Sequence, residues 1–219
     1  MAEKTLKCMC FKMKTVVKIE RFKGKRGYKR VIFNDSSQLQ VDDEIISYFG
    51  IKDGAEFDDN QLKNIKELSA RKIAKDKALE FLKYGGKSER ELIKKLAGLR
   101  LKQEIIDETI DDLKRVGIVN DEEFAMRFSR DFITRKPAGE ILLKMELKKR
   151  GINSEIVEET IKIIYSEFDK KELALKLVKK KKYDPATADV KTKKKMCEFL
   201  LRRGFDWGMV GEVMKINSE

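Results

Sequence analysis

The feature that most constrains the fold is an internal repeat with a period close to fifty residues. Segment 104–110 returns as 155–161, an offset of 51, and the pattern of 147–152 returns at 200–205, a further offset of 53. Such periods are typical of helical modules that bury little apolar surface alone and gain stability by stacking on their neighbours. The sequence therefore predicts a mainly α protein of tandem three-helix repeats, which form an elongated, curved array.

The repeat divides the chain into four predicted segments. Residues 1–57 are expected to form an N-terminal extension and a small β-containing module. The three helical repeats are predicted at 58–118, 119–168 and 169–219, the last being the most divergent.

The N-terminal module is predicted from alternating apolar residues over 15–22 and 28–34, with a third short strand at 38–41. Val17 and Ile19 are expected on the inner face of the first strand, and Val31 and Phe33 on that of the second. A hairpin of two or three strands is marginal alone, so we expect it to pack on a helix.

The joint between the first two repeats is predicted at 117–128. Gly117 suits the end of a helix, and Asn120 or Asp121 can cap the next one. Three phenylalanines recur there at a spacing of four residues and predict an aromatic stripe that faces the core: Phe124, Phe128 and Phe132.

Further helix starts are predicted from capping patterns. Ser88 and Glu91 match a capping box, in which each side chain binds the other residue's backbone amide. Pro137 is expected in the first turn of a helix, and Asn153 or Ser154 at the cap of another.

The charge of the chain is positive and unevenly placed. There are 50 Lys and Arg against 38 Asp and Glu, for a formal net charge of +12. Most of the excess lies in residues 1–30 and 170–195. Two basic zones favour an anionic partner, either DNA or an acidic protein groove; the alternative is that the lysines only solvate helices.

Two groups of cations are the candidate partner-binding residues. One lies on the helix after the central joint, where contact with a partner and simple solvation are equally consistent: Arg127, Arg130, Arg135 and Lys136. The other is denser, and its four consecutive lysines are expected to point all round one helix, too many to pair with acids four residues away. Its members are Lys179, Lys180, Lys181, Lys182, Lys193, Lys194, Lys195, Arg202 and Arg203.

The residue types argue against an enzyme. The chain has no histidine and three cysteines, which is too few for a zinc site of four ligands or for a disulfide framework. It has no glycine-rich phosphate loop, and its acidic helix faces are typical of solvated surface. We expect no catalytic residue, metal or cofactor. Without a long apolar run or a signal-peptide pattern, we expect no membrane association and a cytoplasmic setting.

Taken together, the motifs of the chain resemble those of the RecX family of recombination regulators. The resemblance is carried by Ser88-Glu89-x-Glu91-Leu92, by Gly117-Ile118-Val119-Asn120-Asp121-x2-Phe124-Ala125-x2-Phe128 and by Leu147-x2-Arg150-Gly151-Ile152. It is strongest over 75–165. The residues of these motifs that we assign structural roles are Ser88, Glu91, Asp121, Phe124, Ala125, Phe128 and Gly151.

The resemblance implies a non-enzymatic regulator that binds the RecA recombinase in the groove of its filament on DNA. Such a protein would inhibit the ATPase, strand-exchange and co-protease activities of RecA, and so modulate homologous recombination, DNA repair and the SOS response. We expect a monomer. The alternative is a helical module that binds single- or double-stranded DNA directly, weakly and with strong salt dependence. The acidic segments 104–112 and 155–159 argue against reading of bases by the third helix of the first two repeats.

Overall fold

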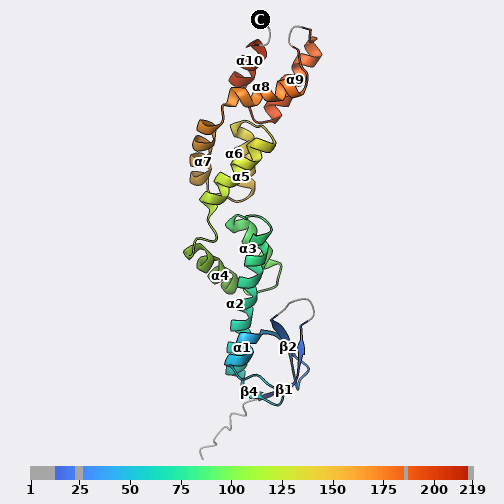
Figure 1. The fold of residues 1–219 in the computed structure, drawn as a ribbon, viewed down its shortest axis with the longest axis vertical. Helices are drawn as coiled ribbons and strands as arrows, with labels where there is room; N and C mark the ends of the chain where they lie inside the picture. The colour runs from blue at the N-terminus through green and yellow to red at the C-terminus, as the bar shows by residue number, and fades with distance from the viewer. Residues whose placement is uncertain (1–12, 23–26, 185–186, 217–219) are drawn as a thin grey trace, which may run out of the picture. The chain divides into compact units, whose positions relative to one another are not determined.

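The computed structural model describes residues 13–22, 27–184 and 187–216 (Figure 1). Their contacts define two compact units. The first contains the residues up to 80 together with 96–109, and the second contains 81–95 together with the residues from 110 onward. The prediction of a mainly helical protein with a small N-terminal β module is confirmed. The four predicted segment boundaries and the curvature of the array stay predictions.

The β module is a four-stranded antiparallel sheet in the order β3-β2-β1-β4. Its strands are β1 (Lys14–Arg21), β2 (Tyr28–Phe33), β3 (Gln38–Asp42) and β4 (Glu56–Phe57). The two residues of β4 are too few for any periodicity, so this strand was not predicted. Helix α1 (Asp43–Tyr48) follows β3 and is capped by the Asp42 carboxylate.

The predicted inner face of β1 is wrong at its first position. Val17 is 59% exposed, whereas Val16 is 1% exposed. Val16 pairs with Phe33 and Lys18 pairs with Ile32, so Val17 is an extra residue in a β-bulge. A bulge of one residue moves the following side chains to the other face of the strand. Phe33 is buried, as predicted.

The core of the first unit joins this sheet to a long helix. Buried strand residues such as Val16, Val31 and Val41 pack with Leu62 and Ile65 near the start of α2 (Asp59–Lys83). The small sheet therefore packs on a helix, as its marginal size requires.

The remaining helices follow in groups of three. The first repeat continues after α2 with α3 (Glu89–Ala97) and α4 (Gln103–Arg115). The second contains α5 (Asp121–Arg135), α6 (Glu140–Lys149) and α7 (Ser154–Glu167). The third contains α8 (Lys170–Lys180), α9 (Val190–Arg202) and α10 (Trp207–Ile216), drawn orange to red in Figure 1.

One hydrophobic cluster runs through the second and third repeats, from α5 to α10. On α5 the side chains that are fully enclosed are Ala125, Ser129 and Ile133, each 0% exposed. Phe128 and Phe132 are only partly buried. The predicted spacing of four residues is right, and Phe124 is buried as predicted, at 8% exposed. The side chains with no exposure are displaced by one residue, and Phe128 and Phe132 lie along the edge of the buried stripe.

The predicted helix starts differ in detail. Asn120 caps α5 through a 3.0 Å bond from the Glu123 amide, and Asn153 caps α7. The prediction for Pro137 is wrong, because α6 begins at Glu140. The N-cap is Gly139, which has no side chain to cap the helix and whose amide donates to the carbonyl of Arg203.

The three repeats share a left-handed turn after their second helix. Arg100, Gly151 and Gly204 have φ values of 57°, 84° and 84°. The amide of the next residue in the later two repeats donates back to Leu147 and Leu200, which closes a Schellman motif. These three positions are equivalent in the sequence repeat, and in the first repeat the left-handed position is occupied by an arginine.

The first repeat is joined to the second through the start of α3. The Ser88 hydroxyl accepts a bond from the Glu91 amide at 3.2 Å and donates to the Arg150 carbonyl at 2.6 Å. The Glu91 carboxylate accepts from the Ser88 amide, and Asp121 accepts from the Glu89 amide. Ser88 thus caps α3 and also binds the end of α6.

The second repeat is joined to the third in the equivalent place. The amides of Gly139 and Ile141, at the start of α6, donate to the carbonyls of Arg203 and Gly204, at the end of α9. Gly139 lies 51 residues after Ser88, and Arg203 lies 53 after Arg150, which are the offsets of the sequence repeat. At both joints, the start of the second helix of one repeat therefore binds the end of the second helix of the following repeat.

This geometry predicts an unequal cost for two helix caps. We expect Ser88→Ala to lower the free energy of unfolding by roughly 2–3 kcal/mol, because it removes a cap and leaves the partly buried Arg150 carbonyl without its donor. The matched control is Asn153→Ala, an exposed cap with no second bond, which should cost about 1 kcal/mol. Urea unfolding followed by circular dichroism measures both. Equal losses would show that the bond to Arg150 contributes nothing.

Candidate partner-binding groove

The lysine run 179–182 lies where α8 ends. Asp169 caps the start of α8, and the helix ends at Lys180. Lys181 is the C-cap and Lys182 adopts a left-handed conformation with φ of 51°. The expectation that all four lysines point round one helix is therefore wrong, since two of them lie on the turn that follows.

Two carboxylates lie between this turn and α9, and both already accept hydrogen bonds. Asp184 accepts a bond from the Thr187 hydroxyl at 2.9 Å. Asp189 caps α9 by accepting from the Thr192 amide at 3.0 Å. Hydrogen bonds from Thr192 hold the pKa of Asp189 below its usual value, so this carboxylate is charged at neutral pH.

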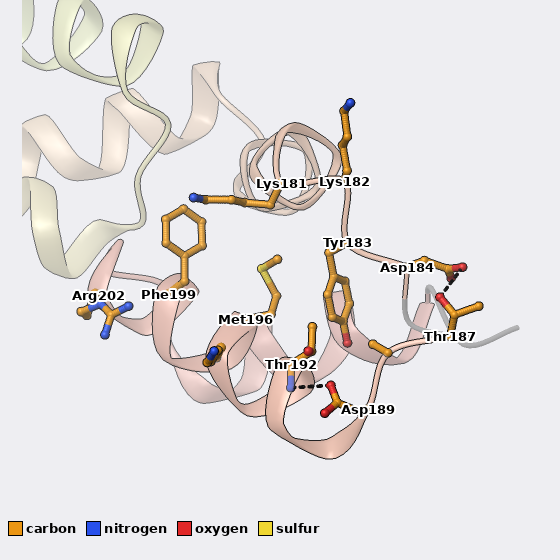
Figure 2. Close-up of a pocket in the computed structure, with 12 residues that line it drawn as sticks. Lys181, Lys182, Tyr183, Asp184, Thr187, Asp189, Thr192, Met196, Phe199 and Arg202 are labelled. Atoms are coloured by element: carbon orange, nitrogen blue, oxygen red, sulfur yellow. Dashed lines mark hydrogen bonds between the residues drawn. The ribbon is translucent and has the colours of Figure 1, made fainter.

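Between this turn and α9 lies a groove of about 810 Å³, which we call the third-repeat groove (Figure 2). Two aromatic side chains and four cations are among its lining residues. Lys181 extends toward the ring of Phe199, with its Nζ atom 5.2 Å from the ring centre. The guanidinium of Arg203 lies 5.6 Å from the same ring. The cationic and aromatic residues of the lining are Lys181, Lys182, Tyr183, Lys195, Phe199 and Arg202.

The groove is electropositive. Its four cations face two lining carboxylates, both of which already accept hydrogen bonds from neighbouring threonines. Within residues 13–22, 27–184 and 187–216, no ion pair engages Lys182, Lys195 or Arg202. These cations without ion pairs suit an anionic partner, because their charge is not neutralised by a carboxylate within the described residues.

The other predicted residues of this cluster lie outside the groove lining. Lys179, Lys180, Lys193 and Lys194 are exposed on the ends of α8 and α9. They add to the positive field around the groove.

The four cations of the central helix do not form one site. Arg130 makes a bidentate pair with Glu167, at 2.9 and 2.7 Å, and this pair lowers the pKa of Glu167. Arg135 binds the Asp131 carbonyl on its own helix, and Lys136 caps the end of α5. The guanidinium of Arg127 lies against Gly86.

The residues with predicted structural roles meet at the first joint. Ser88, Glu91 and Asp121 surround the start of α3, and burial raises the pKa of Asp121. Sequence reasoning assigned no role to Arg150, whose guanidinium binds Glu91 at 2.9 Å and lies 4.2 Å from the centre of the Phe128 ring. The arginine that recurs before the glycine, at 150 and 203, is the signal that points to it.

The described part of the chain contains no group of three or more Cys, Asp or Glu placed to hold a metal ion. None of its helices has the length and apolar character needed to cross a bilayer.

The fold and the groove define a class of protein: tandem three-helix modules that carry strongly charged surfaces. Family models describe the first, second and third three-helix domains of RecX, and they match residues 74–113, 120–161 and 169–214. The chain belongs to the RecX family, and the resemblance drawn from its sequence is confirmed.

Curated relatives carry the name regulatory protein RecX. The one from Clostridium acetobutylicum is 29% identical over 205 residues, covering 92% of this chain and 95% of the relative. That from Streptococcus gordonii is 28% identical over 193 residues, covering 87% and 73%.

Two crystal structures share the fold. One, of a regulatory protein RecX, has a TM-score of 0.64 at 20% identity and covers 92% of this chain and 99% of that one. The other, of RecX from Lactobacillus salivarius, has a TM-score of 0.61 at 23% identity and covers 67% and 96%.

Proposed function

We propose that this protein binds the RecA recombinase in its filament on DNA and inhibits ATP hydrolysis, strand exchange and co-protease activity. It acts in the cytoplasm as a monomer without catalysis of its own. Membership of a family of regulatory proteins supports the role in general. The third-repeat groove is the contact that we assign to the filament, and the observation that carries this assignment is its set of cations without ion pairs.

The experiment is a RecA ATPase and strand-exchange assay with this protein titrated from sub-stoichiometric to stoichiometric ratios. The variant Lys181→Glu, Lys182→Glu, Lys195→Glu reverses the charge of the groove. We expect it to need about tenfold more protein for half-inhibition, because like charges across an interface oppose association. The matched control reverses three exposed lysines that are not part of this groove's lining: Lys52, Lys162 and Lys176.

Two outcomes would contradict the proposal. If the wild-type protein leaves both RecA activities unchanged at stoichiometric ratios, the function is wrong. If the groove variant and the control inhibit equally well, the function stands and the groove is not the contact.

A second candidate function is direct binding of DNA through the same basic surface. The specific observation in its favour is the presence of Tyr183 and Phe199 among the cations, since aromatic rings and cations together bind single strands. Anisotropy of a labelled oligonucleotide at several salt concentrations measures it. Loss of phosphate contacts in the groove variant would reduce the salt slope by about one for each cation removed.

A further inference from the structure

A second groove lies within the second unit, at the joint between α3 and the helices α5 and α6. It has a volume of about 590 Å³ and shares no lining residue with the third-repeat groove. Its lining combines an apolar floor with a basic rim. We call it the joint groove.

The floor of the joint groove is built from stacked planar groups. The rings of Phe124 and Phe128 are nearly parallel, at 14°, with their centres 6.0 Å apart. The Arg150 guanidinium covers Phe128 and is held by Glu91 and by Glu146. These contacts fix the floor before any partner arrives, which reduces the entropy lost on binding.

The rim of the joint groove carries three lysines, none of which forms an ion pair with a described carboxylate. Lys87 donates to the carbonyls of Gly85 and Gly86, at 3.0 and 3.5 Å. The Nζ atom of Lys95 lies 4.9 Å from the centre of the Phe81 ring, and Lys94 is exposed to solvent.

The charges of the joint groove leave an excess that a partner can neutralise. Its single lining carboxylate, Glu91, already accepts bonds from Arg150 and from the Ser88 amide. Arg150 is itself paired with Glu91 and Glu146, so the unneutralised charge of the lining is that of Lys87, Lys94 and Lys95. The complement of this surface is an acidic segment with an apolar side chain for the floor.

We propose that the joint groove binds an acidic segment of a partner protein, with one large apolar side chain seated on the floor and flanking carboxylates on Lys87, Lys94 and Lys95. A protein segment is favoured over a nucleic acid because bases bind by stacking on open ring faces. Here Arg150 lies over one face of Phe128 and Phe124 stacks on the same ring, so no free ring face is offered to a base. An apolar side chain needs only the part of the half-buried Phe128 that stays exposed. The proposal goes beyond the regulation of RecA and holds whichever macromolecule occupies the third-repeat groove.

The test uses the full chain and a fluorescein-labelled peptide with one phenylalanine between pairs of glutamates, followed by anisotropy at low salt. We expect saturable binding that weakens about tenfold in the variant Lys94→Glu, Lys95→Glu. The control Lys52→Glu, Lys162→Glu has the same net charge and should bind like wild type. Both lysines are exposed but lie in the last turn of α3, where negative charge is unfavourable, so circular dichroism of the variant checks that α3 stays folded.

Two further probes separate the components of the proposal. A peptide with alanine in place of phenylalanine should bind several-fold more weakly, because the floor is then empty. A single-stranded oligonucleotide of equal net charge should not displace the labelled peptide. The proposal is overturned by absence of binding at millimolar peptide, by equal binding to variant and control, or by displacement with the oligonucleotide. No RecA is present, so this test and that of the proposed function fail independently.

Discussion

Replacing Gly204 by alanine should be among the most destabilising single substitutions in the second and third repeats. Gly204 has a φ of 84°, where an L residue is strained by about 1–2 kcal/mol. A Cβ atom built there would lie 2.3 Å from the backbone nitrogen of Leu142, on α6. Because backbone cannot move aside as a flexible side chain can, the joint must open. We expect a total loss of roughly 2–5 kcal/mol in the free energy of unfolding.

The control for this substitution is Gly117→Ala. Gly117 has a similar φ of 73°, but nothing lies within 4 Å of the position of its Cβ atom. It therefore reports the strain alone, about 1–2 kcal/mol. Urea unfolding of both variants gives the difference. If Gly204→Ala and Gly117→Ala lose the same stability, the close approach of α6 to the end of α9 is wrong.

The second large effect is expected at Ile133 and not at its aromatic neighbour. Ile133 is 0% exposed within the core of the second and third repeats, so Ile133→Ala should cost about 2–5 kcal/mol. Phe132→Ala removes more atoms, but they are only partly buried, and we expect about 1–2 kcal/mol. Thermal and urea unfolding of the two variants measure the order. If Phe132→Ala costs more stability than Ile133→Ala, the phenylalanines form the buried face of α5.

Much of the fold follows from the sequence because helical spacing and repeats are local patterns. Positions 100, 151 and 204 are related by the offsets of the sequence repeat, and all three adopt left-handed backbone angles. The errors arise where tertiary contacts decide. The bulge at Val17 depends on pairing with β2, and the phase of the stripe on α5 depends on what packs against it. Gly139, the N-cap of α6, donates its amide to Arg203 at the end of α9, a distant contact that no local pattern contains.

The candidate grooves were predictable only in part. The density of lysines pointed to the third repeat, but the end of α8 decides which of them face α9. The joint groove gave no signal in the sequence, because its floor comes from residues that looked like ordinary core. Arg150 acts there through contacts with residues 22 and 59 positions away, Phe128 and Glu91, which no local pattern contains.

The two joints within the second unit also indicate which helical modules can be exchanged between repeat proteins. At each joint, a residue at the start of the second helix of one repeat binds the backbone of the following repeat. The second helix of that following repeat ends in a left-handed turn. The first joint makes this connection with a serine hydroxyl, and the second makes it with two glycine backbones in contact. A chimaera that exchanges modules while keeping each start with its matching turn retains the connection, whereas one that places a bulky residue opposite a glycine turn does not.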